Sequence, residues 1–318
     1  MSTPPPPRTS RPRPRPAPDR REPEAATRRR EEAGRTHRDV VSFVRRGERL
    51  TPSRQAAWDR LAGDYVLDPP RGERDTLPGE GAVLDLEELF GRRAELVVEV
   101  GSGLGENIVA AALAHPERDH LGVEVYLPGL AQTLSRVDRA ERPRNLRLLP
   151  LDAQRALPAM LPTGSIDELW VYFADPWPKA RHHKRRIINP PFLDAVLPLL
   201  AEGARFRLAT DWAQYANHMR RVLDARPELV FLHPDGPRPE GTTSDRVPEG
   251  MPATGWAPRF EGRVKTSFEN KGREAGRLIW DLAYLRGIGP RRRTSPRTRE
   301  HRRTADRPAA ALPERDLE

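Results

Sequence analysis

Residues 169–186 combine an apolar run, an acid and a dense basic cluster in one short stretch, LWVYFADPWPKARHHKRR. The apolar residues are typical of a buried parallel strand, which Pro176 and Pro178 would end. Asp175 then lies at the carboxyl end of that strand, where open α/β sheets bind their ligands. This stretch predicts an acid-lined pocket beside a surface that binds a polyanion. The cations suited to phosphate groups are Lys179, Arg181, Lys184, Arg185 and Arg186.

Three further acids close other candidate strands, namely Glu99 in LVVEVG, Glu124 in LGVEVY and Asp152 in LLPLDA. In related sheets an acid at such a position accepts hydrogen bonds from ribose hydroxyls, which suits Glu124, and Asp152 could receive an adenine amino group. A single acid at a strand end more often caps the following helix. Because four acids, Asp175 included, follow successive strands, we favour a ligand site over separate caps.

The first of these strands runs into a glycine-rich turn, LVVEVGSGLGENIVAAALA. Gly101, Gly103 and Gly105 let the backbone turn tightly and approach a ligand before a helix that we expect to begin near Glu106. A dinucleotide-binding fingerprint starting at Gly101 would need its third glycine at position 106, which Glu106 occupies. The turn argues against NAD, and it resembles the nucleotide-binding turn of class I S-adenosylmethionine-dependent methyltransferases.

Strands and helices alternate between the two ends of the chain, which predicts an α/β fold with a doubly wound, mostly parallel sheet. Residues 234–276 are rich in Pro and Gly, so the last strand could return as an antiparallel edge or as an inserted partner. We expect one domain over residues 39–286. The candidate strands are residues 95–100, 120–125, 145–152, 166–175, 204–211, 229–233 and 277–285.

The formal charge of +9 over 318 residues is concentrated at the ends of the chain. Residues 1–38 carry 11 Arg against 5 acids, and residues 287–318 carry 9 Arg against 5 acids, which leaves −1 for the part between them. Global basicity therefore does not show that this part binds nucleic acid, and the cluster after Asp175 is the better evidence. The Arg/Pro-rich ends have few apolar residues to bury, so we expect both to be disordered extensions or weak RNA tethers.

The composition also excludes several classes of protein. The chain has no cysteine, and therefore no disulfide framework, thiolate metal site or Cys nucleophile. It shows neither an apolar segment of membrane-spanning length nor an amino-terminal hydrophobic signal region. We therefore expect a cytoplasmic protein that does not associate with a membrane. His182 and His183 lie among cations without a spaced third ligand, so no metal site is predicted.

Taken with these acids, the basic motif FADPWPKARHHKRR resembles the hallmark of the bacterial tRNA (guanine-N7)-methyltransferase family. Further similar segments are SFVRRGERLTPSRQAAWDRL at residues 42–61, ATDWAQYANHM at 209–219 and TSFENKG at 266–272. The resemblance covers roughly residues 38–286. Ala174 stands where the family usually has proline before the aspartate, which could alter the backbone of that loop, and the long Arg/Pro tails are additional.

The resemblance implies methyl transfer from S-adenosylmethionine to guanine N7 in the variable loop of tRNA, at tRNA position forty-six, by a monomer or homodimer. It implies that Glu99, Glu124, Asp152 and Asp175 line the donor site together with the three glycines of the turn, and that Asp175 is also at the reaction centre. The substrate guanosine would be held by Lys179, Asp211, Thr266, Ser267, Phe268 and Glu269. The tRNA backbone would contact Arg181, His182, His183, Lys184, Arg185 and Arg186.

The chemistry is consistent with a site that lacks an obvious strong base. Guanine N7 already exposes a lone pair, so attack on a sulfonium methyl needs positioning more than deprotonation. Asp175 could stabilise the positive charge that develops on the purine, or it could orient the N1 and N2 edge of the guanine. Trp177, beside this acid, could stack on a displaced base or pack against the sheet, whereas we expect Trp212 and Tyr215 to serve helix packing.

Two other classes of protein were weighed against a tRNA methyltransferase. A nicotinamide-dependent oxidoreductase would share the sheet, but the third fingerprint glycine is missing and the basic run is unexplained. A noncatalytic tRNA-binding protein would have basic segments but no need for acids at four strand ends. A methyltransferase acting on a protein or a small molecule is the nearest alternative, and the phosphate-suited cluster argues against it.

Overall fold

The computed structural model describes residues 42–43, 47, 49–243 and 247–287. Most of both tails, for which we predicted disorder, therefore lies outside the described residues. The helices and strands reported below all belong to the unit Arg45–Glu318. Within the described ranges, none of the helices combines the length and apolar character that a bilayer span requires.

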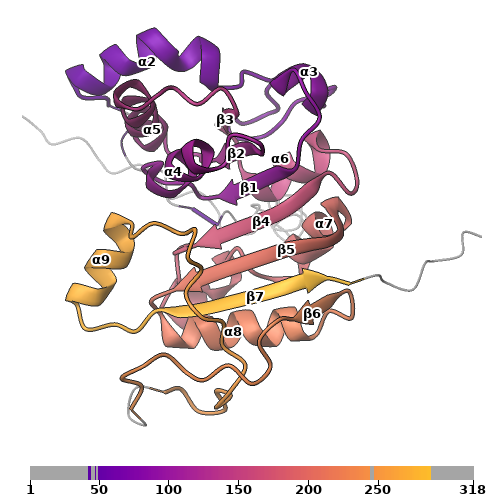
Figure 1. Ribbon diagram of the computed structural model, residues 1–318, viewed down its shortest axis with the longest axis vertical. Helices are drawn as coiled ribbons and strands as arrows, with labels where there is room; N and C mark the ends of the chain where they lie inside the picture. Colours follow the sequence, from indigo (N-terminus) through magenta and orange to yellow (C-terminus); the bar gives the residue numbers. More distant parts are fainter. Residues whose placement is uncertain (1–41, 44–46, 48, 244–246, 288–318) are drawn as a thin grey trace, which may run out of the picture. The chain divides into compact units, whose positions relative to one another are not determined.

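Seven strands form one sheet in the order β3-β2-β1-β4-β5-β7-β6 (Figure 1). β1 to β5 run parallel, whereas β7 lies antiparallel between β5 and β6. The predicted α/β, mostly parallel sheet with an antiparallel C-terminal strand is confirmed, and β7 is an inserted partner, not an edge. The strands are β1 (Leu96–Val100), β2 (Asp119–Val123), β3 (Leu146–Leu149), β4 (Ile166–Tyr172), β5 (Leu200–Thr210), β6 (Leu229–Phe231) and β7 (Trp280–Arg286).

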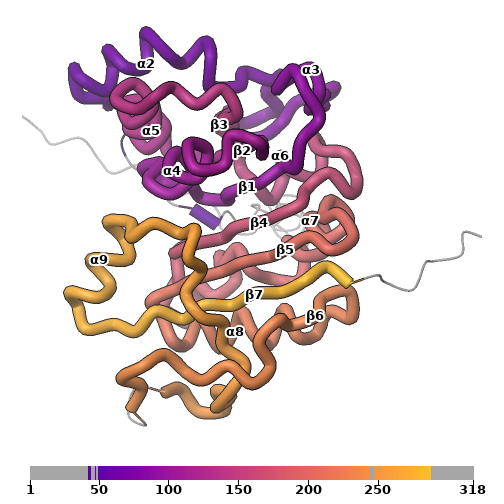
Figure 2. Tube along the Cα trace, viewed as in Figure 1, coloured from indigo at the N-terminus to yellow at the C-terminus, as the bar shows by residue number. Residues whose placement is uncertain are grey.

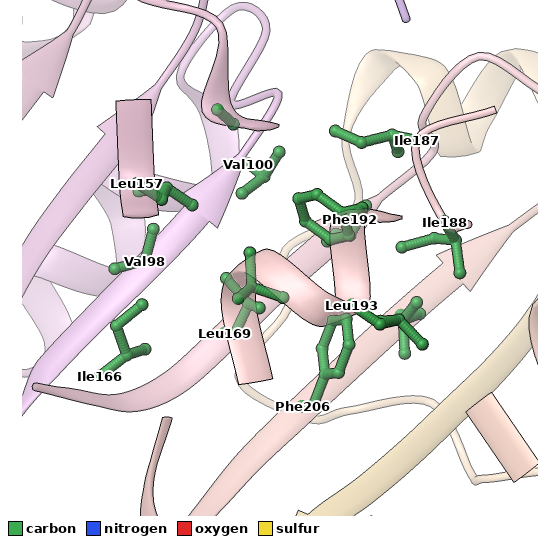
Figure 3. Close-up of a cluster of buried hydrophobic side chains, with 14 of the residues drawn as sticks. Val98, Val100, Leu157, Ile166, Leu169, Ile187, Ile188, Phe192, Leu193 and Phe206 are labelled. Atoms are coloured by element: carbon green, nitrogen blue, oxygen red, sulfur yellow. The ribbon is translucent and has the colours of Figure 1, made fainter. Parts of the chain in front are cut away.

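Helices cover both faces of the sheet because successive strand residues point to opposite sides. Val97, Leu148 and Trp170 pack with α2 (Pro52–Tyr65), α4 (Glu106–Ala114) and α5 (Leu127–Arg139). On the other face, strand side chains pack with α6 (Ala153–Met160), α7 (Pro190–Val196) and α8 (Ala213–Asp224). This second core is drawn in Figure 3, where Val98 of β1 lies beside Leu157 of α6, and Leu169 of β4 lies toward Leu193 of α7. Tyr215 of α8 is fully buried in the same core, as predicted.

The short elements are placed by local chemistry. Thr266 caps α9 (Ser267–Glu274), since its side chain accepts a hydrogen bond from the Glu269 N–H at 3.2 Å. Figure 2 shows that the chain makes a long excursion after β6 before it reaches α9, and α9 then leads into β7. The remaining helices are α3 (Leu86–Phe90) and the 3₁₀ segments η1 (Ala180–Arg185) and η2 (Leu197–Leu199).

Candidate active site

The four predicted ligand-site acids lie at one edge of the sheet. Val100 pairs in register with both Val123 and Val171, so the carboxyl ends of β1, β2 and β4 are level. β1 lies between β2 and β4, which is the topological switch point where open α/β sheets bind ligands. Glu99 is in β1 and Glu124 directly follows β2, whereas Asp152 and Asp175 each lie three residues beyond the ends of β3 and β4.

The glycine turn after β1 has the backbone that its sequence predicts. Gly101, Gly103 and Gly105 have φ values of 74°, 57° and 73°, and α4 begins at Glu106. The Gly101 N–H donates to the Val123 carbonyl at 2.8 Å, which ties the turn to β2. A Cβ on Gly101 would meet no atom within 4 Å among the described residues, so this side of the turn is open.

Glu99 is the most perturbed acid of this edge. Its side chain is only 4% exposed, and burial raises its pKa to about 8, although the neighbouring Asn107 amide favours the charged form. Within the part of the chain that the structure describes, Glu99 Oε2 and the nearby buried Asn107 Nδ2 lack a hydrogen-bond partner of good geometry. Ser102 Oγ in the turn is buried and unpartnered in the same way. Buried polar atoms of this kind are normally satisfied by a ligand or by water.

Glu124 holds the glycine turn while keeping acceptor capacity. Its Oε2 accepts from the Gly103 N–H and its Oε1 from the Tyr126 N–H, both at 2.8 Å. The Val125 N–H also interacts with this carboxylate, and an ionised carboxylate has about four lone-pair sites, so some acceptor capacity remains for another donor. Burial raises the pKa of Glu124, and the negative charge of Asp175 raises it further.

Asp152 acts at least as a helix cap. It is buried, it immediately precedes α6, and its Oδ1 accepts from the Gln154 N–H at 3.0 Å. The capping interpretation that we weighed for single acids therefore holds for this residue. A cap uses one of its carboxylate lone pairs, so capping and binding of a ligand amino group are compatible.

The loop that carries Asp175 leaves β4 earlier than we predicted. β4 ends at Tyr172, because Phe173 adopts a φ of 53° and its N–H donates to the Ala209 carbonyl of β5 at 2.8 Å. Trp177 has a φ of 44°, a second non-glycine residue in the left-handed region. Such conformations concentrate at functional sites, where the surrounding structure holds them. Asp175, between these two residues, is exposed at the sheet edge.

Trp177 contacts basic residues of its own loop. The Arg185 guanidinium lies 4.3 Å from the ring centroid, and His182 packs edge-on at 5.9 Å. Lys179, Arg181 and Lys184, which we predicted to hold the nucleotide or the tRNA backbone, are exposed, whereas His182, His183 and Arg185 are half-buried.

Arg186 is placed differently from our RNA-binding prediction. Its side chain is 1% exposed, its Nε donates to the Pro176 carbonyl and its Nη2 to Gln214 Oε1, both at 2.9 Å. Its guanidinium also lies 5.1 Å from the ring centroid of Tyr215. Arg186 therefore fixes the loop against α8, because burial removes it from the surface that a phosphate could reach.

The predicted substrate segment 266–269 lies at the start of α9 and presents its four residues differently. Thr266 is the helix cap, and the Phe268 ring is 51% exposed, with its Cε2 atom 3.8 Å from the position a Cβ on Gly103 would take. Glu269 is 0% exposed and forms ion pairs with three arginines, so in this structure it orders the segment and is not open to a substrate. Asp211 is half-buried and pairs with Arg277 at 2.7 Å.

Comparison with known proteins assigns the chain to a family. Residues 93–282 match the family described as "Putative methyltransferase". A tRNA (guanine-N(7)-)-methyltransferase of Arthrobacter sp. (strain FB24) is 45% identical over 276 residues, covering 77% of this chain and 86% of the relative. The tRNA (guanine-N(7)-)-methyltransferase of Paenarthrobacter aurescens is 43% identical and covers 77% of this chain and 90% of the relative. That of Alkalilimnicola ehrlichii is 40% identical and covers 82% of this chain and 99% of the relative.

The chain belongs to the tRNA (guanine-N(7)-)-methyltransferase family. The resemblance inferred from the motif after β4 is thereby confirmed, and the chain is a methyltransferase. The family match begins close to β1 and ends within β7, so it includes β1 to β6 and the start of the inserted strand. In this tRNA (guanine-N(7)-)-methyltransferase family member, the residues described above form no cluster of three or more His, Asp or Glu that could hold a metal ion.

Three residues near the site were not predicted from the sequence to be functional. Glu106 and Asn107 bind the segment before α9, and Arg263 is a fully buried cation that pairs with Asp281 at 3.0 Å and lies over the rings of Tyr172 and Phe173. Glu106 and Asn107 had one usable signal, since the first turn of a helix after a glycine turn faces the ligand edge. Arg263 had none, because nothing in the sequence separates a buried arginine from an exposed one.

Proposed function

We propose that this chain transfers a methyl group from S-adenosylmethionine to N7 of the variable-loop guanosine of tRNA, at tRNA position forty-six. The observation that carries this proposal is the common edge of the sheet, where an open glycine turn and the buried acid Glu99 lie beside Asp175 and a basic loop. Membership of the family supports both the reaction and the tRNA substrate.

The residues at this edge fit S-adenosylmethionine. Glu99 Oε2 is buried and unpartnered among the described residues, so a cationic or hydrogen-bonding group of the donor would satisfy it. Glu124 keeps acceptor capacity for a ribose hydroxyl, the Asp152 carboxylate would accept from the adenine amino group, and the open side of Gly101 leaves room for the backbone to approach the ligand. When bound, the donor supplies an electrophilic sulfonium methyl group.

The residues of this chain then act by positioning and electrostatics. Guanine N7 is already nucleophilic, so the site requires no base to activate it. Asp175, exposed at the sheet edge, orients the base or stabilises the cation that forms on it. Phe268 and Lys179 flank the acceptor side, and the exposed cations Arg181 and Lys184 contact backbone phosphates of the tRNA.

The test is transfer of labelled methyl from S-adenosylmethionine to unmodified bulk tRNA, followed by strand cleavage specific for N7-methylguanosine. Wild-type protein is compared with Asp175→Ala, and Glu88→Ala on exposed helix α3 is the control. Cleavage at the variable loop that is lost only with Asp175→Ala supports the proposal. Methylation at another site of the tRNA would refute position forty-six as the target. Binding of the donor without any transfer would refute tRNA as the acceptor.

A further inference from the structure

The segment before and at the start of α9 is tied to the first turn of α4 by two neighbouring residues. The Ser267 N–H and Oγ–H both donate to Glu106 Oε2, at 2.8 and 3.0 Å. The Val264 N–H donates to Asn107 Oδ1 at 3.1 Å. Because Glu106 and Asn107 directly follow the glycine turn, these bonds join the donor side of the site to the acceptor side.

Both hydrogen-bond donors of Ser267, its backbone N–H and its hydroxyl, bind Glu106. These two bonds fix the segment in place. Its neighbour Phe268 is thereby held with its exposed ring beside Gly103 of the glycine turn. The segment that would recognise the guanosine is therefore positioned by a residue outside that segment.

Glu106 is itself held in a defined geometry. Its other oxygen, Oε1, accepts from Arg136 Nη2 of α5 at 3.1 Å, and its side chain is 19% exposed. A carboxylate at the first position of a helix is also favoured by the helix dipole. Glu106 occupies the position at which a dinucleotide-binding turn would have glycine, and glycine could make none of these bonds.

Asn107 reaches from the acceptor segment to the buried acid of the donor site. Its Oδ1 holds Val264, while its amide lies close enough to Glu99 to favour the charged form of that acid. A group that orders Glu99 and the glycine turn would order the first turn of α4, and with it the segment 264–269.

We propose that Glu106 is a positioning residue that couples binding of the methyl donor to binding of the acceptor nucleotide. This inference rests on the proposed function for the identity of the two substrates. Since coupling is reciprocal, bound donor raises the affinity for tRNA by the same factor by which bound tRNA raises the affinity for donor. Removing the Glu106 carboxylate breaks both bonds to Ser267 and leaves only the Val264–Asn107 bond between the α9 segment and the glycine turn, so the segment moves more freely.

The test uses S-adenosylhomocysteine as an unreactive donor probe and an unmodified tRNA transcript. The affinity of each for the full-length chain is measured alone and with the other saturating, for wild type, Glu106→Ala and the control Asp138→Ala. Asp138 is 21% exposed against 19% for Glu106 and is likewise paired with arginine, but its partners are Arg60 of α2 and Arg142 just after α5. We expect coupling of about 5- to 150-fold in wild type and in the control.

In Glu106→Ala the coupling factor should fall severalfold toward one, because only the Val264–Asn107 bond remains. The affinity for S-adenosylhomocysteine alone should change less than about threefold, since none of the donor contacts is removed. Ser267→Ala, which keeps the backbone bond, should show an intermediate factor. Undiminished coupling in Glu106→Ala, an equal loss in Asp138→Ala, or absence of coupling in wild type would each overturn the proposal.

Hydrogen exchange separates this inference from the proposed function. S-adenosylhomocysteine should slow amide exchange over residues 264–274 in wild type and in Asp138→Ala but not in Glu106→Ala. If wild type fails to methylate tRNA and this pattern persists, the linkage stands and the acceptor is wrong. If wild type methylates tRNA but S-adenosylhomocysteine does not change amide exchange in residues 264–274, the Glu106 linkage is wrong and the proposed function stands.

Discussion

Replacing Glu99 by glutamine should make the folded protein more stable in alkaline solution while weakening donor binding. Burial raises the pKa of this acid from 4.5 to about 8. The folded state therefore binds more protons than the unfolded state between these two values, so the free energy of unfolding falls as the pH rises through this window. The penalty is absent below about pH 4.5 and complete above about pH 8.

The size of the penalty follows from the shift. The difference between 4.5 and about 8 is roughly 3.5 pH units, which at about 1.36 kcal/mol per unit gives about 5 kcal/mol. Between pH 5.5 and 8.5 the wild type should lose about 3 kcal/mol through this group. Glutamine has nearly the same shape and no charge to bury, so the variant escapes this loss.

The measurement is urea unfolding of wild type and Glu99→Gln at pH 5.5 and 8.5, without donor, followed by tryptophan fluorescence. Groups remote from Glu99 titrate alike in both proteins, so the change in the difference between their free energies of unfolding reports on Glu99 and its charge coupling to Glu124. The exposed Glu88→Gln is the control and should show no such change. Donor affinity of Glu99→Gln, measured by calorimetry, should fall about 10- to 100-fold, the loss of a charge-assisted hydrogen bond. A difference in stability that is the same at both pH values would refute the reasoning.

Four further substitutions have expected outcomes. Asp175→Asn should lower turnover by roughly a hundredfold and leave donor affinity nearly unchanged; equal losses in rate assays and calorimetry would contradict an electrostatic role. Lys184→Ala should flatten the plot of log tRNA affinity against log salt by about one unit, whereas Arg186→Met should leave that slope unchanged and lower the free energy of unfolding by about 2–4 kcal/mol, because its guanidinium is buried. Gly105→Ala should lower the urea midpoint, since φ is 73° and the new Cβ would lie 2.7 Å from Thr133 Cβ; an unchanged midpoint would show that the helix start relaxes freely.

The sheet could be predicted because its signals are local. Each strand begins and ends in residues whose apolar run and flanking Gly, Pro or acid are visible in the sequence, and all seven predicted strands are present. The position of β7 between β5 and β6 was left open, since periodicity shows that a strand forms but not which edge it joins. The early end of β4 was also missed, because the left-handed conformation of Phe173 depends on its bond to β5.

The candidate site divides in the same way. The four acids and the glycine turn were found from their positions at strand ends, and the structure brings them to one edge. The basic motif was treated as one surface, but Arg186 lies inward, where it binds the Pro176 carbonyl and Gln214 of α8. Glu269 likewise became the centre of an arginine cluster through Arg259 and Arg263, which lie in a segment without regular structure. Burial of a charged side chain is decided by distant parts of the chain, and the sequence does not display it.

Because β7 lies between β5 and β6, the last strand of the chain holds this side of the sheet together. β5 pairs with β7 over six residues and β6 has β7 as its ladder partner, so a chain ending before Trp280 would expose the long edge of β5 and detach β6. Unpaired edges of this kind recruit other chains. A translation product that ends before Trp280 would therefore tend to aggregate through the unpaired edge of β5. It would do so even though it already contains the glycine turn, the four acids and the basic loop.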